Sequence, residues 1–146
     1  MVKGQPPNEE WDLSSLNLER LRKIVLNAKN HNLHVVIALA HIPGRPSEFR
    51  KRDYRIWRED RYKREFIKAW KTITETLKEI DAVVGHDLIN EPYLPKESSS
   101  ITPLVDLYQK TINAIRSVDE DTPIVLESPN VAAVNNIRHS YVFFDI

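Results

Sequence analysis

Apolar residues recur every three or four positions in three stretches of the chain, which is the spacing of a helix that buries one face. The first predicted helix covers residues 16–30, and Asp12, Ser14 and Ser15 before it can cap its free N–H groups. The second covers residues 58–80. The third begins at Pro103, with Thr102 as its cap, and runs to about residue 118. The expected buried stripes are Leu18, Leu21, Val25 and Ala28; Tyr62, Phe66, Ala69, Ile73, Leu77 and Ile80; and Leu104, Leu107, Tyr108, Thr111, Ile115 and Val118.

Four short apolar or β-branched runs alternate with these helices and predict strands. They cover residues 35–40, 82–90, 124–128 and 137–144, and the segment 129–136 before the last predicts a second connection, a single helical turn. Strands that alternate with helices are typical of βαβ units, so the fold class is α/β with a parallel sheet. Ligands of such sheets bind at the carboxyl ends of the strands. Those ends are residues 40–42, 90–91, 127–128 and 143–145.

The composition narrows the class of protein. The 146 residues suit one domain spanning residues 1–146. Lys plus Arg and Asp plus Glu both number 21, so the balanced charge disfavours nucleic acid and anionic membranes as partners. The basic stretch at residues 50–64 contains interleaved acids. There is no cysteine, no apolar run of membrane-spanning length and no hydrophobic signal-peptide core at the start, and the cellular location stays open.

Several kinds of site are disfavoured by missing motifs. The three glycines form no phosphate-binding loop, and no Gly-x-Ser-x-Gly elbow is present. The five histidines are scattered and form no metal-ligand pair, so we expect no cofactor and no metal.

The most informative feature for the function is a carboxylate side chain at the end of a predicted strand. In the segment DLINEPYLP, residues 87–95, an apolar run stops at Asn90 and Glu91. A half-desolvated carboxyl group there would have its neutral form favoured, as a general acid requires. Asn90 could orient a sugar hydroxyl. Taken alone, however, Asn-Glu-Pro also suits a simple turn at the end of a strand.

The flanking sequence resembles glycoside hydrolase family 5, the cellulase and mannanase group. VVGHDLINEPY is similar to its fourth-strand signature, TINAIRSVDEDTPIVLES to the following helix and fifth strand, and LERLRKIVLNAKNHNLHVVIALAHIPG to its second helix and third strand. The resemblance runs from about Trp11 to Ile146. It implies parallel βα units of a TIM (β/α)8 barrel, of which this chain contains about half.

The resemblance also implies a reaction and roles. Family members hydrolyse β-linked polysaccharides such as glucan or mannan with retention, using two carboxyl groups about 5–5.5 Å apart. Glu91 matches the acid/base, and Asn90 matches the residue that holds the 2-hydroxyl of the sugar. His41, Trp57 and Tyr93 are candidates for lining the substrate cleft. The family nucleophile ends the seventh strand, which we expect outside this chain; Glu127 matches the fifth strand instead.

Two positions depart from the family pattern. Ala40 stands where the family has a histidine, and His41 lies one residue later. The family's His-x-Tyr pair in the sixth strand aligns with Val142 and Phe144, or with His139 and Tyr141 if the alignment is shifted.

Half a barrel would leave sheet edges unpaired and the inward side chains Val35, Ile37, Val84, Leu88, Val125 and Phe143 without partners. The sequence therefore predicts either a piece of a larger barrel or a half-barrel that forms a homo-oligomer through its edges. Two other functional hypotheses remain: a barrel remnant that binds carbohydrate without turnover, and an unrelated parallel α/β protein.

Overall fold

A computed structural model describes residues 16–44, 54–95, 98, 100–129 and 143–145. Its elements, in chain order, are α1 (Leu18–Asn30), β1 (Val35–Ala38), α2 (Arg55–Arg58), α3 (Asp60–Leu77), β2 (Val83–Asp87), α4 (Thr102–Arg116), β3 (Ile124–Leu126) and β4 (Phe143–Asp145). The predicted alternation of helices and strands is therefore confirmed, with shorter strands than the apolar runs suggested.

The strands form one sheet in the order β1-β2-β3-β4, and β1, β2 and β3 are parallel as predicted. The fourth strand was expected to be parallel as well, and this is wrong, because β4 runs antiparallel to β3 and Asp145 pairs with Ile124. An apolar run predicts a strand but carries no information on its direction, which depends on the connection. Consequently residues 143–145 do not end at the edge where β2 and β3 end.

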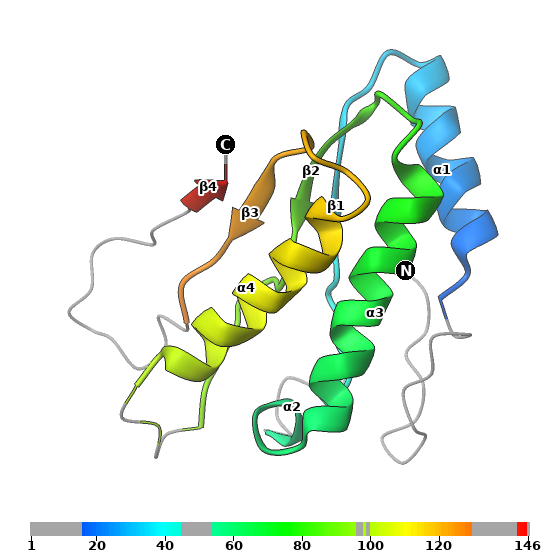
Figure 1. Ribbon diagram of the computed structural model, residues 1–146. Coiled ribbons are helices and arrows are strands. Elements are labelled where there is room, and N and C mark those ends of the chain that lie inside the picture. The colour runs from blue at the N-terminus through cyan, green and yellow to red at the C-terminus, as the bar shows by residue number, and fades with distance from the viewer. Residues whose placement is uncertain (1–15, 45–53, 96–97, 99, 130–142, 146) are drawn as a thin grey trace.

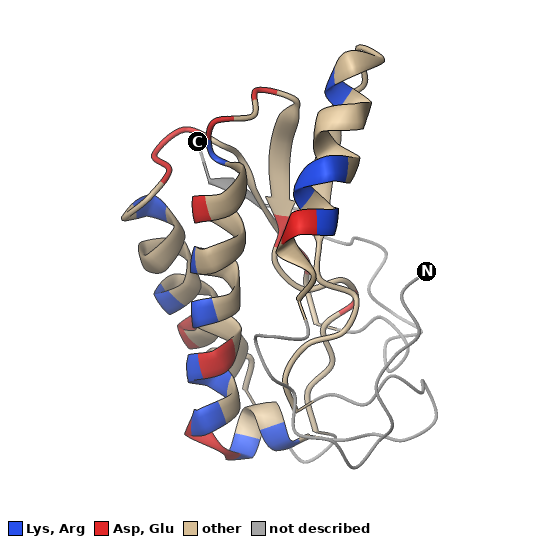
Figure 2. Ribbon diagram, turned by 90° about the vertical axis from the view of Figure 1, so that its right-hand side faces the viewer, with Lys and Arg blue, Asp and Glu red and all other residues tan. Residues whose placement is uncertain are grey.

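Helices α3 and α4 pack against each other over one face of the sheet, and α1 lies beside α3 (Figure 1). The predicted stripe of the second helix is buried throughout, and that of the third is buried from Leu104 to Ile115. In α1 only Val25 is fully buried, and the other three stripe residues are half-buried. Charged residues lie mainly along the helices, while the strands carry few (Figure 2).

The helix starts differ in detail from the predictions. Asn17 Oδ1 accepts a hydrogen bond from the Arg20 N–H and caps α1, whereas Asp12, Ser14 and Ser15 lie outside the described residues. Thr102 is already helical, and its N–H donates to Ser100 Oγ. Residues 55–58 form the separate short helix α2, so the long helix begins at Asp60.

Trp70 connects α3 to the sheet. Its side chain is fully buried, and its Nε1–H donates to the main-chain oxygen of Leu88 at 3.1 Å. The indole also meets the His86 ring edge-on, with the ring centroids 5.5 Å apart. Through this hydrogen bond, helix α3 contacts the segment that precedes Asn90 and Glu91.

The other face of the sheet exposes Val36 (52%) and Val84 (39%). Exposure of Val84 agrees with the prediction, but Ile37 and Leu88 were also expected on the uncovered face and are instead buried. The register shifts between Val35 and Val36, which pair with Val83 and Gly85 and leave Val84 as the additional residue. In β2 such a residue changes the phase of the alternation between the two faces, which accounts for the burial of Leu88. Strand β1 alternates regularly, and Ile37 lies on its buried face.

Gly44 fixes the loop that follows β1. Its φ of +67° lies in the left-handed region, and a Cβ there would lie 2.7 Å from Ile56 N and 2.9 Å from Tyr62 Cγ. Only glycine allows the loop to approach α2 and α3 so closely. In the part of the chain described, no helix is long and apolar enough to cross a bilayer.

Candidate active site

Asn90 and Glu91 lie just beyond the carboxyl end of β2, which ends at Asp87. Leu88 and Ile89 before them are fully buried, and the Leu88 N–H donates to Val125 O at 3.3 Å, which holds the segment against β3. Asn90 and Glu91 themselves are exposed. A buried segment therefore leads to both polar residues, which are exposed near the strand end as the sequence predicted.

The main chain of Glu91 adopts an unusual conformation. Its φ is +48°, in the left-handed region, and its N–H donates to Glu127 Oε2 at 2.8 Å. The carboxyl ends of β2 and β3 thus come together through these two glutamates. Asn-Glu-Pro thus forms the strand-end turn that its sequence predicts. This turn also lies on the rim of the sheet, as the strand order predicted.

Glu127 belongs to a group of acidic and phenolic side chains behind this turn. The Tyr108 hydroxyl, on α4, donates to Glu127 O at 2.9 Å. Burial, with the negative charge of Glu127 beside it, raises the pKa of Asp87 to about 6. Burial, followed by the charges of Asp87 and Glu127, also raises the pKa of Tyr108. The Oδ1 atom of Asp87 is buried without a hydrogen-bond partner among the described residues. Asp87 and Tyr108 were not predicted as site residues. The presence of a carboxylate inside an apolar strand could have indicated Asp87.

We expect Asp87→Asn to change the pH dependence of stability. The pKa of Asp87 is raised from its ordinary 3.8 to about 6, so protonation favours the folded state. The stabilisation is complete below pH 3.8 and is lost as the pH rises through about 6. Asn keeps the neutral shape at every pH, so urea unfolding between pH 4 and 8 will show the variant gaining stability relative to the parent protein as the pH rises.

The exposed Asp106→Asn on α4 is the control, because it should leave this pH profile unchanged. A stability difference between Asp87→Asn and the parent that does not vary between pH 4 and 8 would contradict the shift of the Asp87 pKa.

Trp57 and Tyr93, both half-buried, are brought together as neighbours. The Trp57 Nε1–H donates to Tyr93 O at 2.8 Å. The Tyr93 ring in turn meets Tyr54 edge-on, with the centroids 5.7 Å apart. The loop after Glu91 is therefore held by Trp57 in α2 and by Tyr54, the residue that precedes α2. Two of the predicted cleft-lining aromatics therefore lie at the loop that follows Glu91, and their role in binding stays a prediction.

The remaining predicted site residues are less constrained. His41 is exposed on the turn after β1, and Ala40 before it is exposed as well. His139, Tyr141 and Val142 lie outside the described residues, as does the side chain of Phe144.

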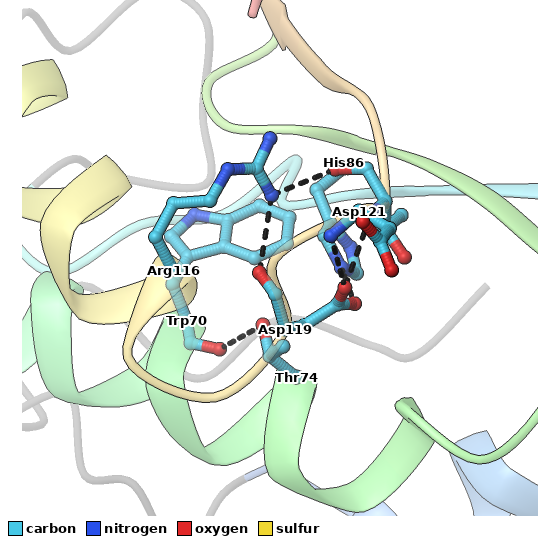
Figure 3. Close-up of polar contacts among 7 residues, drawn as sticks. Trp70, Thr74, His86, Arg116, Asp119 and Asp121 are labelled. Carbon is cyan, nitrogen blue, oxygen red and sulfur yellow. Dashed lines mark hydrogen bonds and ion pairs between the residues drawn. The ribbon is translucent and has the colours of Figure 1, made fainter. Parts of the chain in front are cut away.

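A second polar cluster lies at the amino-terminal end of β3 (Figure 3). His86 is 1% exposed, and its Nε2 lies 3.8 Å from Asp119 Oδ2. Burial lowers the pKa of His86, and the Asp119 carboxylate only partly offsets this effect. Arg116 Nη1 donates to the main-chain oxygens of Asp119 and Thr122, which closes the turn before β3. This end of a parallel sheet is the one that serves stability rather than catalysis.

No group of three or more His, Cys, Asp or Glu side chains within the described ranges is arranged to hold a metal ion. The described residues at the rim supply carboxyl, amide and aromatic groups.

Residues 2–141 match the family model described as cellulase (glycosyl hydrolase family 5). The chain belongs to glycosyl hydrolase family 5. The resemblance read from the sequence is confirmed, and the hypothesis of an unrelated parallel α/β protein is wrong. The family fold is a TIM barrel, and the described α/β units with their parallel strands form part of it.

Solved structures of the family agree with this fold. Endo-glycoceramidase II from Rhodococcus sp., solved as a ganglioside GM3 complex, is 22% identical with a TM-score of 0.61, and the match covers 82% of this chain and 37% of that one. An endoglucanase is 23% identical with a TM-score of 0.61, over 88% of this chain and 37% of that one. The family 5 chain thus spans little more than a third of the length of these structures. No curated protein sequence matches it significantly.

Proposed function

We propose that this family 5 chain provides the acid/base part of a retaining glycoside hydrolase that acts on β-linked glucan or mannan. Family membership makes glycoside hydrolysis the reaction class. The observation that carries the proposal is the position of Glu91, which is exposed two residues after the fully buried Ile89, just beyond the carboxyl end of β2. In a TIM barrel this is the end of the strands that holds catalytic groups.

The roles follow from the chemistry of retention. Glu91 would donate a proton to the glycosidic oxygen as the bond to the leaving sugar breaks, while a second carboxylate attacks the anomeric carbon. Glu91, now ionised, would then remove a proton from the water that hydrolyses the glycosyl intermediate. Asn90, next to it, can both donate to and accept from a sugar 2-hydroxyl.

Glu127 is a poor candidate for the second carboxylate. Its Oε2 accepts the Glu91 N–H, and its charge adjoins Asp87. An oxygen engaged with the main chain of the acid residue is not directed at a sugar bound above it. We therefore assign the nucleophile to neither Glu127 nor any other described residue.

The test is hydrolysis of β-1,4-linked gluco- and manno-oligosaccharides by a protein that contains both this chain and the strand carrying the second carboxylate, with the anomer of the first product followed by proton NMR. The expected first product is the β-anomer. An α-anomer as first product would overturn the retaining mechanism. If calorimetry shows binding of the oligosaccharides but no product forms, the chain is a carbohydrate-binding protein, and the absence of both binding and turnover would refute the proposal entirely.

A further inference from the structure

The conformation of Glu91 requires an explanation. A residue with a Cβ is unfavourable in the left-handed region, because the Cβ approaches the carbonyl oxygen too closely. Glu91 nevertheless has a φ of +48°, at an exposed position. Its N–H donates to Glu127 Oε2 at 2.8 Å, a hydrogen bond to a charged acceptor and hence a strong one.

Glu127 is itself held from the helix layer. The Tyr108 hydroxyl donates to its main-chain oxygen at 2.9 Å, and Tyr108 is only 6% exposed. Because this bond involves the main chain of Glu127, it fixes the residue whatever its side chain is. The carboxylate of Glu127 therefore extends from a fixed point on β3 to the chain that follows β2.

We propose that Glu127 is the positioning residue of Glu91, whose main chain it holds in the left-handed conformation so that the carboxyl group meets the glycosidic oxygen. This inference rests on the proposed function of Glu91, but the hydrogen bond and its consequences for the main chain do not. Asp87 contributes from β2 below its pKa of about 6, where its neutral form leaves the Glu127 carboxylate as the single negative charge of the pair.

The hydrogen-bonding role and the charge of Glu127 can be separated with two variants. Glu127→Gln retains a side-chain oxygen that can accept the Glu91 N–H but removes the charge. Glu127→Ala removes both. Glu120→Ala, an exposed position in the turn before β3, is the matched control.

Three measurements decide the proposal. Hydrogen exchange of the Glu91 amide should accelerate by about tenfold in Glu127→Ala and much less in Glu127→Gln. The coupling constant between the amide and Hα protons of Glu91 should report a change of φ in Glu127→Ala alone. In both variants the carbon-detected titration of Asp87 should shift below its midpoint of about 6, because the neighbouring charge is gone.

Activity gives the fourth measurement. We expect kcat to fall by about 100-fold in Glu127→Ala, with KM nearly unchanged and substantial rescue in Glu127→Gln, because misplacing a catalytic group by about 1 Å costs that much. Unchanged exchange and coupling of Glu91 in Glu127→Ala would overturn the positioning role, and so would equal loss of kcat in both variants. If a protein that carries both this chain and the second carboxylate lacks turnover, the proposed function fails, while exchange and coupling still decide whether Glu127 holds Glu91.

Discussion

Replacing Glu91 by glutamine is expected to lower kcat on an unactivated β-glycan by about 10²–10⁴-fold, the usual contribution of general acid–base catalysis. Gln keeps the size and the hydrogen-bonding edge of Glu but has no proton to give to the glycosidic oxygen. The left-handed main chain and its bond to Glu127 involve no side-chain atom of Glu91, so the fold should be retained.

The leaving group distinguishes loss of an acid from general damage to the site. In an aryl glycoside of an acidic phenol, the leaving group departs as a phenolate and needs no proton. Glu91→Gln should therefore reduce cleavage of that glycosidic bond far less than cleavage of an oligosaccharide. Glu79→Gln, at an exposed position after α3, serves as the control and should match the parent protein on both substrates. Equal losses on both substrates would argue against Glu91 as the acid.

The helix layer was predictable because its signal is local and repeated. The stripe from Tyr62 to Ile80 contains six residues at helical spacing, and all of them are buried. The direction of β4 was not predictable in this way, since an apolar run looks the same in a parallel and an antiparallel strand. The additional residue Val84 was also missed, because a register shift depends on the partner strand.

Some features of the candidate site could likewise be predicted from the sequence, and others could not. The placement of Glu91 at the end of β2 followed from the sequence, because the apolar run stops at Asn90. Its bond to Glu127 could not be read from the sequence, since the two residues are 36 positions apart and meet only through the pairing of β2 with β3. Trp57 was selected as an aromatic residue near the site, but its indole partner, Tyr93 O, is a main-chain atom that no side-chain pattern reveals.

The largest expected effect on stability comes from Trp70→Ala, at about 3–5 kcal/mol of unfolding free energy. The side chain is fully buried between α3 and the sheet, so its removal leaves a cavity, and Leu88 O loses the Nε1–H that satisfies it. A loss of this size is a large fraction of the roughly 5–15 kcal/mol that holds a typical domain together. Urea denaturation at pH 7 measures it directly.

Trp70→Phe separates the two contributions, because it keeps an aromatic ring in the core but removes the indole N–H. We expect it to cost about 1–3 kcal/mol, the penalty for an unsatisfied buried carbonyl. The His86 ring provides an independent readout, since its pKa is lowered mainly by burial against groups such as the Trp70 indole. Water admitted by Trp70→Ala should raise that pKa toward its ordinary 6.5, as followed by proton NMR. If Trp70→Phe proved as destabilising as Trp70→Ala, the hydrogen bond to Leu88 rather than the packing would dominate. In that case α3 would stabilise the chain before Glu91 through a single polar contact.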